Sequence, residues 1–331
     1  MYAHLSNARR QIKRLASELH VIAVVFNPIR FISRYNLFES FRKHAEDAGA
    51  RLWVVELAFG ERPLEIADPT NPQHIIFHTH KAHDQELWHK ECMINEAVAR
   101  LPHDWKYVAW VDADVTFLNP DWVHETMQQL QHYPIVQMFT HAVDLGPNGE
   151  PIDQFQSFGY SKLTSSTDGP PRIPGIKRVG GYYGKYWHPG LGWAYRRSAW
   201  DTLGGLLDIN IVGGGDHQMA YGLIGRINEA IPNGCHPNYV NAIRNWGQHA
   251  LLLKKKIGAV PSTIVHHWHG RKVSRGYKDR WKILSDNQFD PLIDIRKDWQ
   301  RMWQLSGNKI KLRDELMTYF RSRNEDGVEN N

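Results

Sequence analysis

Two aspartates stand at the end of an apolar segment. Residues 107–111 read YVAWV, and Asp112 and Asp114 follow with one alanine between them. Carboxylates at this spacing can point to one side once a strand bends into a loop, and hard divalent cations prefer such oxygen ligands. A diphosphate would be repelled by this pair unless a cation lay between them. The motif therefore indicates a metal-assisted phosphate site, with an exposed acidic turn as the alternative for so short a pattern.

A second candidate group is the run HHWHG, which contains His266, His267 and His269. If residues 261–270 form a strand, His267 and His269 share a face and His266 points to the opposite one. Mn²⁺ accepts mixed imidazole and oxygen ligands, so a histidine here could complete a site begun by the aspartates. The alternative for each histidine is a surface position or a satisfied place in the core.

Asp216 is the third candidate, because it follows the triple glycine of residues 213–215. Glycines let the backbone approach a ligand closely. A carboxylate beside an acceptor hydroxyl can take its proton, which is the task of a general base. The same position also suits an aspartate that only caps the following helix.

The elements that must position these residues alternate along the first part of the chain. We expect a helix over 5–19, a strand over 21–26, a helix over 33–48 with Ser33 as its N-cap, strands over 51–57 and 74–80, a helix over 84–100 and a strand over 107–111. Such alternation is typical of a parallel sheet flanked by helices, and continuous apolar runs indicate strands buried on both faces. Ligands of these sheets bind beyond the carboxyl ends of the strands, where the two aspartates lie.

The rest of the chain is less regular. Residues 145–190 are rich in Gly, Pro and Ser, and we expect them to form a mobile segment that faces the substrate. A late strand over 261–270 should be followed by amphipathic helices over 297–305 and 310–323. The polar end, residues 324–331, is expected to be disordered.

The bulk composition is that of an ordinary globular protein, with 331 residues, 42% apolar and 23% charged. A net charge of +5 fits a phosphate-bearing ligand and permits nucleic acid without demanding it. Cys92 and Cys235 cannot build a disulfide framework or a zinc cluster. No apolar run approaches the ~18 residues of a membrane span, and the N-terminus has no apolar signal segment. We therefore expect a cytoplasmic protein of a bacterium or of a virus-infected cell.

The succession of these motifs resembles the GT-A family of nucleotide-sugar-dependent glycosyltransferases, over roughly residues 20–280. It looks closest to the branch of the polypeptide N-acetylgalactosaminyltransferases and the β-1,4-galactosyltransferases, where a glycine-rich segment with an arginine precedes GGEN or GGED. Residues 190–197 (GLGWAYRR) and 213–216 (GGGD) are similar to these motifs. The chain departs at Gly215, where the family usually has Glu, and this leaves Asp216 as the sole candidate base.

The resemblance implies an α/β, Rossmann-like fold with a mostly parallel central sheet over residues 1–285. Within it, residues 20–140 would bind the nucleotide sugar, and residues 141–285 would supply the acceptor half and the metal-binding histidine. Residues 286–331 would form a helical C-terminal extension.

The resemblance also implies the roles of single residues. Asp112 and Asp114 would hold Mn²⁺ or Mg²⁺ on the donor diphosphate, Asp114 most directly, and His269 is the first choice for the histidine ligand, ahead of His267 and then His266. The implied nucleotide-sugar contacts are Asn27, Pro28, Glu56, Lys90, Asn95, Trp110, Arg271 and Lys272, with Arg275 as a further diphosphate contact. The implied contacts to the donor sugar or the acceptor are His188, Gly192, Trp193, Gly214 and Gly215.

The implied activity is transfer of a sugar, with a UDP-sugar as the expected donor, to an acceptor hydroxyl. One acceptor is a hydroxymethylated pyrimidine in phage DNA, which the basic and aromatic tracts 175–187 and 271–282 favour. A bacterial surface polysaccharide or lipid-linked glycan is the second. A nucleotidyltransferase and a nucleic-acid-binding protein without catalysis remain as different classes. The sugar, the stereochemical outcome and the oligomeric state stay open.

Overall fold

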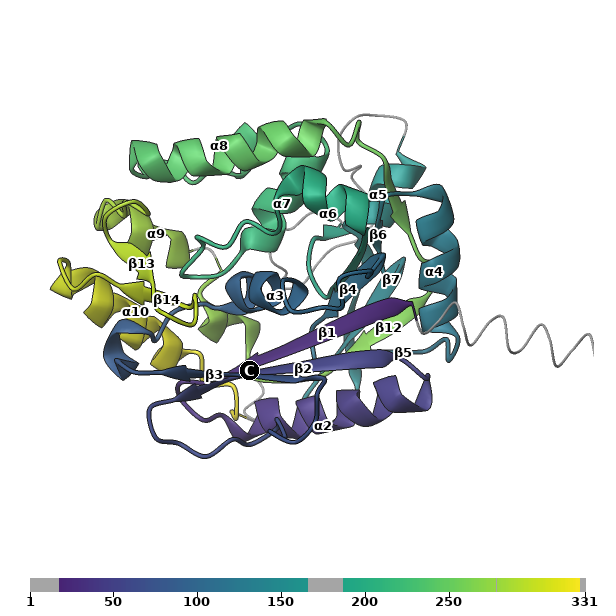
Figure 1. Ribbon diagram of the computed structural model, residues 1–331, viewed down its shortest axis with the longest axis horizontal. Coiled ribbons are helices and arrows are strands. Elements are labelled where there is room, and N and C mark those ends of the chain that lie inside the picture. The colour runs from purple at the N-terminus through teal and green to yellow at the C-terminus, as the bar shows by residue number, and fades with distance from the viewer. Residues whose placement is uncertain (1–17, 166–186, 278, 328–331) are drawn as a thin grey trace, which may run out of the picture.

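The computed structural model describes residues 18–165, 187–277 and 279–327, which build an α/β structure around a seven-stranded sheet (Figure 1). In spatial order the strands are β11 (Ile257–Ala259), β6 (Ile135–Gln137), β10 (Gly192–Arg196), β4 (Tyr107–Val111), β1 (Leu19–Phe26), β2 (Arg51–Phe59) and β3 (His74–Thr79). Strand β10 runs antiparallel to both of its neighbours, and the other adjacent pairs are parallel. The predicted α/β fold with a mostly parallel central sheet is therefore confirmed.

Helices cover both faces of this sheet, as Figure 1 shows for α2 on one side and for α3, α7 and α8 on the other. The helices around the sheet are α2 (Ile32–Asp47), α3 (Lys90–Val98), α4 (Trp122–His132), α6 (Arg197–Leu203), α7 (Gly215–Leu223) and α8 (Pro237–Leu251). In β1, Val21 belongs to the hydrophobic cluster that contains Phe38 of α2, whereas Ile22 belongs to the cluster that contains Ile94 of α3. Because successive side chains of a strand point to opposite faces, this double burial explains the continuous apolar run.

A second sheet of five strands brings distant segments to the end of β4. Its order is β5 (Val115–Phe117), β12 (Thr263–His266), β7 (His141–Leu145), β8 (Pro151–Ser157) and β9 (Trp187–His188). In this register His266 pairs with Val115 on one side and with Asp144 on the other. The late histidine is thereby placed beside the residues that follow the two aspartates.

The remaining elements gather at one end of the molecule in Figure 1. They are α9 (Arg280–Asp286), β13 (Ile295–Lys297), β14 (Trp303–Leu305) and α10 (Ile310–Ser322). The structure also has the helix α5 (Phe158–Thr164) and the short 3₁₀ helices η1 (Ala82–Asp84), η3 (Ile227–Ala230) and η4 (Lys272–Arg275). Helix α10 confirms the prediction for residues 310–323.

The helix predicted over 297–305 is wrong, because β13 and β14 form a hairpin there. The Asp298 carboxylate accepts hydrogen bonds from the backbone N–H groups of Gln300 and Met302, both at 2.9 Å. Arg301 adopts a left-handed conformation with φ of 70°. An aspartate that bonds nearby backbone amides favours a turn, so the local bonding overrides the helical spacing of the apolar residues.

The expected disorder of residues 324–331 is also wrong for its first half. Glu325 is 1% exposed, and the Asp326 carboxylate accepts hydrogen bonds from Ile32 N (2.9 Å) and Ser33 N (2.8 Å). Asp326 thus satisfies the N-terminal amides of α2, and the N-cap residue is Phe31 rather than Ser33. Residues 328–331 lie outside the described residues.

Three further expectations need adjustment. The expected helix over 5–19 falls mostly outside the described residues, and Leu19 already belongs to β1. The expected helix over 84–100 begins only at Lys90. The segment 145–190 contains β8 and α5 rather than loop alone, and residues 166–186 lie outside the described part. Among the described helices, none is both long and apolar enough to cross a membrane.

Candidate active site

The two aspartates lie in the turn between β4 and β5, at the carboxyl end of the parallel strands. Asp112 N donates to Leu191 O, and His267 N donates to Asp114 O, both at 2.8 Å. The side chains take different partners, since Asp112 pairs with Lys90 and Asp114 pairs with a histidine. The motif therefore serves two separate tasks.

Asp114, His266 and His269 form a compact group. Asp114 Oδ2 lies 2.8 Å from His269 Nε2 and 3.7 Å from His266 Nε2. The two Nε2 atoms are 3.4 Å apart, and one ligand atom from each of the three residues lies within 4.8 Å of the others. The other carboxylate oxygen, Asp114 Oδ1, is buried without a hydrogen-bond partner in the described part of the chain. One orphaned carboxylate oxygen and two imidazole nitrogens are a suitable donor set for a divalent metal ion.

The predicted orientation of the histidines is wrong. His266 and His269 face each other, whereas His267 points away and its Nε2 lies 2.8 Å from Thr116 Oγ1. The reason is that β12 ends at His266, so the alternation of a strand does not extend to the next residues.

Two carboxylates that were not predicted from the sequence lie beside the Nδ1 atoms of His266 and His269. His266 Nδ1 lies 2.6 Å from Asp144 Oδ1, and His269 Nδ1 lies 3.8 Å from Glu325 Oε2. Carboxylates behind metal-binding histidines orient the rings and fix their tautomers. Asp144 also pairs with Lys272, a predicted diphosphate contact that lines the second cavity.

The titration behaviour follows from this crowding of charges. Burial tends to raise the pKa of Asp114, but the charges of His269 and His266 outweigh it and hold this pKa well below its usual range. Burial lowers the pKa of His266, but Asp114 and then Asp144 outweigh it and raise this pKa to about 9. Before a cation arrives, His266 is thus protonated at neutral pH, and metal binding must release that proton.

Lys90 connects the remaining acids. It pairs with Asp112, and although burial lowers the pKa of Lys90, the nearby carboxyl groups of Asp112, Asp216 and Glu91 raise it above its ordinary value. Burial raises the pKa of Asp112, Lys90 opposes that rise, and Asp114 adds to it. Lys90 therefore remains charged at the centre of the site.

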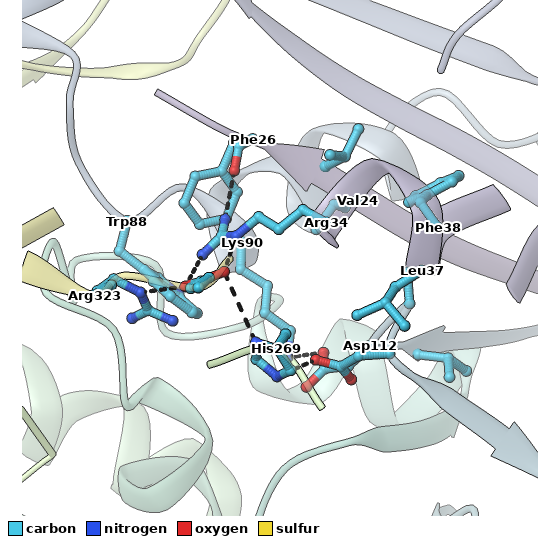
Figure 2. A pocket seen from close by; sticks show the side chains of 15 residues that line it. Val24, Phe26, Arg34, Leu37, Phe38, Trp88, Lys90, Asp112, His269 and Arg323 are labelled. Atoms are coloured by element: carbon cyan, nitrogen blue, oxygen red, sulfur yellow. Dashed lines mark hydrogen bonds and ion pairs between the residues drawn. The ribbon is translucent and has the colours of Figure 1, made fainter. Parts of the chain in front are cut away.

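Two cavities meet at these residues. The first has a volume of about 690 Å³ and lies over the carboxyl ends of β1 and β4, as Figure 2 shows with Arg34, Trp88, Lys90, His269 and Arg323 around it. The second has about 950 Å³ and extends towards α7 and β9. Both are lined by the same six side chains at their junction: Trp88, Lys90, Asp112, Asp114, His269 and Arg323.

The first cavity combines apolar walls with a buried ionic group. Figure 2 shows Phe26, Phe38 and Trp88 on its walls, and the rings of Phe26 and Trp88 pack edge to face with centroids 5.2 Å apart. Glu325 Oε1 accepts hydrogen bonds from Arg34 Nη2 (2.7 Å) and Arg323 Nε (2.5 Å). The C-terminal segment therefore forms one side of this cavity.

The second cavity contains Asp216 near the start of α7. The helix is capped by Gly214 without a side-chain hydrogen bond, so capping is not the task of Asp216, whose Oδ1 accepts from the adjacent His217 N (2.8 Å). A Cβ atom at Gly190 would lie 2.5 Å from Asp216 Oδ2, so this glycine leaves room for the carboxylate. His188 and Gly214, both predicted contacts, line the same cavity.

Three more buried side chains line the second cavity: Arg275, which was predicted as a diphosphate contact, and Glu91 and Arg280, which sequence reasoning missed. Burial raises the pKa of Glu91 to about 7; Lys90 lowers it and Asp216 raises it further. Arg275 Nη1 donates to Tyr277 Oη at 2.9 Å, and the guanidinium of Arg280 lies over the Tyr277 ring, 5.2 Å from its centroid.

Several predicted contacts have other partners. Asn27 bonds the backbone of Phe31 in its own turn, and Glu56 accepts from the N–H groups of residues 65–67. Asn95 bonds the backbone of Leu206, and Pro28 O accepts from Arg62. None of these four predicted residues lines either cavity.

Five further predicted contacts also lie apart from the two cavities. Trp110 and Trp193 are buried in the core, where they line a small space behind Asp216, and Gly192 begins β10. Gly215 begins α7, and Arg271 precedes η4; neither lines either cavity.

No protein-family model matches the chain, and no match exists among curated proteins. Solved structures to which it is similar include Drosophila β-1,4-galactosyltransferase 7 in complex with manganese, UDP-Gal and xylobiose, with 13% identity, a TM-score of 0.31 and coverage of 64% of this chain and 61% of that chain. Staphylococcus aureus TarS has 13% identity and a TM-score of 0.37 over 92% of this chain and 43% of its own. A protein designated a nucleotide-diphospho-sugar transferase, from Desulfovibrio desulfuricans, has 11% identity and a TM-score of 0.31 over 93% and 98%.

These structural neighbours include nucleotide-sugar glycosyltransferases, the class that the order of motifs resembles. The chain spans less than two thirds of the length of the first two of them. At such identities and TM-scores the likeness assigns no role to any residue. The functional proposal therefore depends on the geometry of the site itself.

Proposed function

We propose that this chain is a metal-dependent glycosyltransferase, which moves a sugar from a nucleoside-diphosphate sugar to an acceptor hydroxyl. The observation that carries the proposal is the position of Asp114 and His269 at the junction of two cavities, with His266 beside them. Transfer from a diphosphate requires one compartment for the nucleotide, one for the acceptor, and positive charge between them.

The first cavity suits the nucleotide. Phe26, Phe38 and Trp88 offer apolar and aromatic surface to a base and ribose, and the cavity lies beyond the carboxyl ends of parallel strands, where such ligands bind. The diphosphate would then lie at the junction, beside Lys90 and Arg323. We propose a UDP-sugar as the donor.

Asp114, His266 and His269 would hold the divalent cation. Two imidazoles among three ligands favour Mn²⁺ over Mg²⁺, which prefers an all-oxygen shell. Such a cation, when bound, stabilises negative charge on the diphosphate oxygens. Asp112 would act less directly than predicted, because its carboxylate pairs with Lys90 and holds that charge at the junction.

Asp216 would remove the proton of the acceptor hydroxyl. Asp216 lines the second cavity and not the first, and a carboxylate within reach of a hydroxyl is a competent general base. The cations at the junction, Lys90 and Arg323, add to the stabilisation of the departing nucleoside diphosphate.

For the acceptor, we keep a hydroxymethylated pyrimidine of DNA as the first proposal and a bacterial glycan as the second. The tract 271–282 supports the DNA proposal less than its sequence alone did, because Arg275 and Arg280 are buried against the cavity and Lys272 pairs with Asp144. The tract 175–187 lies outside the described residues, apart from Trp187. We also propose a cytoplasmic location, which both thiols, free in the described structure, would suit.

Release of nucleotide from UDP-sugars tests the proposed function. The chain should hydrolyse a UDP-sugar slowly in the presence of Mn²⁺, release UDP, and stop when the metal is chelated. Release of sugar 1-phosphate, with transfer of the UMP group, would instead indicate a nucleotidyltransferase. Neither turnover nor binding of any nucleotide sugar would refute the proposal. Labelled sugar in hydroxymethylated duplex DNA, but not in unmodified DNA, would support the first acceptor; labelled lipid-linked or surface glycan would support the second.

A further inference from the structure

Gly215, the first residue of α7, has a backbone conformation that other residues can also adopt. Gly213 and Gly214 have positive φ values of 82° and 85°, but Gly215 does not. What limits a side chain at position 215 is its surroundings, because a Cβ atom there would lie 3.0 Å from Asn210 Nδ2 and 3.2 Å from Glu91 Oε1. The space beside Gly215 is thus occupied by the carboxyl group of another helix.

Glu91 is placed in this space from α3. Its side chain is buried at 4% exposure, and Trp88 Nε1 donates to Glu91 Oε2 at 2.9 Å, which fixes the rotamer. The other oxygen faces Gly215, next to Asp216 in the sequence, and both acids line the second cavity. Burying a carboxyl group is costly, so a buried acid at a cavity wall needs a compensating contact.

A second polar group nearby lacks a partner. Asn210 is 1% exposed, and its Nδ2 group has no hydrogen-bond partner among the residues that the structure describes. Its Oδ1 atom accepts from Tyr239 Oη at 2.6 Å, so the amide is held with Nδ2 towards Gly215. A buried acid that lines the second cavity and a buried donor therefore lie close together beside Gly215.

We propose that Glu91 is a substrate-binding acid that works with Asp216 and holds a substrate hydroxyl group in the second cavity. The inference rests on the proposed function. It assigns to Glu91 the hydroxyl contact that a glutamate at position 215 would make in the motif of residues 213–216. The carboxylate that is missing from position 215 is supplied by α3, and Gly215 is small because Glu91 fills its place. The hydroxyl belongs either to the donor sugar or to the acceptor, and the two are separated by experiment.

Moving the carboxylate between the two helices tests this. The variants are Glu91→Ala, Gly215→Glu and the double variant E91A/G215E, with Glu91→Gln as a variant of unchanged size. The affinities for UDP and for the UDP-sugar that the wild type hydrolyses fastest are measured by calorimetry with Mn²⁺, and hydrolysis of that UDP-sugar is measured in parallel. Glu91 does not line the first cavity, but it bonds Trp88, which does, so UDP affinity is the reference and the preference for UDP-sugar over UDP is the quantity compared.

If Glu91 holds the donor sugar, E91A lowers the preference for UDP-sugar over UDP by about tenfold, the loss expected for a hydrogen bond to a charged group, and E91A/G215E restores it. If it holds the acceptor hydroxyl, whose place water takes in hydrolysis, that preference is unchanged, the hydrolysis rate falls about tenfold, and the double variant restores it. The inference is overturned if E91A changes neither quantity, or if E91A/G215E is no better than E91A. A wild type that neither binds nor hydrolyses a UDP-sugar would refute the proposed function instead.

A stability measurement without ligand checks the geometry independently. Gly215→Glu should lower the melting temperature in the wild type, because its Cβ and carboxylate would crowd Glu91. In the E91A background the same substitution should lower it less. Equal shifts in both backgrounds would show that the two positions do not share one space, and would contradict the inference.

Discussion

The meeting of His266 and His269 depends on where a strand ends. His266 is the last residue of β12 and is held there by Asp144, its neighbour in β7. The chain then turns, which brings His269 back to Asp114 and sends His267 to Thr116. The run therefore provides two candidate metal ligands, His266 and His269. It also provides one histidine, His267, that lies outside the candidate metal site and can serve as a control.

Alanine substitutions of the three histidines should therefore differ. His266→Ala and His269→Ala each remove a ligand, and Mn²⁺ affinity should fall by more than the roughly 10–100-fold that loss of an outer partner costs. His267→Ala is the control and should bind Mn²⁺ as the wild type does. Titration followed by the electron paramagnetic resonance of free Mn²⁺ measures this. Equal loss in all three variants would contradict the assignment.

Asp216 should affect turnover without affecting metal or nucleotide binding. It is not a member of the group around Asp114, and it lines the second cavity but not the first. Asp216→Asn should lower the rate of transfer, or of UDP-sugar hydrolysis, by about 10²–10⁴-fold, the usual contribution of a general base. Unchanged turnover in this variant, with normal UDP affinity, would remove Asp216 from the mechanism.

At the scale of elements, the segment after α10, residues 323–327, lines the first cavity. Glu325 lies between Arg34 and Arg323 and near His269, and Asp326 supplies the acceptors for the first amides of α2. One short segment thus joins the metal group, the first cavity and a helix that covers the sheet. Its removal would leave buried arginine charge without a carboxylate.

A chain that ends after Arg323 should consequently lose stability. Loss of a buried partner costs about 3–5 kcal/mol, and loss of the cap adds about 1 kcal/mol. A chain that ends after Gly327 keeps both acids and is the matched control. Urea denaturation of the two chains measures the difference, and Glu325→Gln is the substitute if the shorter chain does not fold. Equal stability would show that this segment is not a structural part of the site.

The sequence predicted those elements that depend on a local pattern. The apolar runs of β1, β2 and β4 and the periodicity of α2 and α10 identify them, since burial on two faces or on one stripe leaves a clear signature. The β13–β14 hairpin was missed because the bonds of Asp298 to the backbone compete with helical spacing.

The supporting residues of the site had no such signature. Glu91, Asp144, Arg323 and Glu325 reach it from segments far apart in the chain, and the packing of α3, β7 and the C-terminal segment decides that they meet. A signal existed only for Glu91, as the carboxylate missing at Gly215 in an otherwise similar motif. The spacing of Asp112 and Asp114 predicted the position of the proposed metal site. The partner of each aspartate could not be predicted, because it depends on tertiary contacts.

On the scale of the whole molecule, buried neutral histidines should make the fold sensitive to acid. Burial lowers the pKa values of His20, His89 and His217 to about 4. Above the unfolded value of about 6.5 neither state is protonated, whereas between about 6.5 and 4 only the unfolded chain takes up these protons. The contribution of these three histidines to stability should therefore be full above pH ~6.5, and between pH ~6.5 and 4 it should fall by up to about 1.4 kcal/mol per pH unit for each of them.

Denaturant unfolding at pH 7, 6 and 5 measures this slope. His89→Gln should make the dependence of the free energy of unfolding on pH shallower, because this substitution removes one of the buried histidines. His103→Gln, at an exposed position, is the control and should leave this slope unchanged. A free energy of unfolding that stays constant or rises from pH 7 to pH 5 would contradict the prediction.

The most direct test of the central claim is a calorimetric titration of UDP into the wild-type chain, once with Mn²⁺ and once with a chelator. The diphosphate should bind at the junction of the two cavities only when Asp114, His266 and His269 hold the cation, so we expect one binding site with Mn²⁺ and at least a tenfold weaker affinity without it. Equal affinity under both conditions would mean that this group of residues does not hold the metal for the nucleotide, and the account of the site would be wrong.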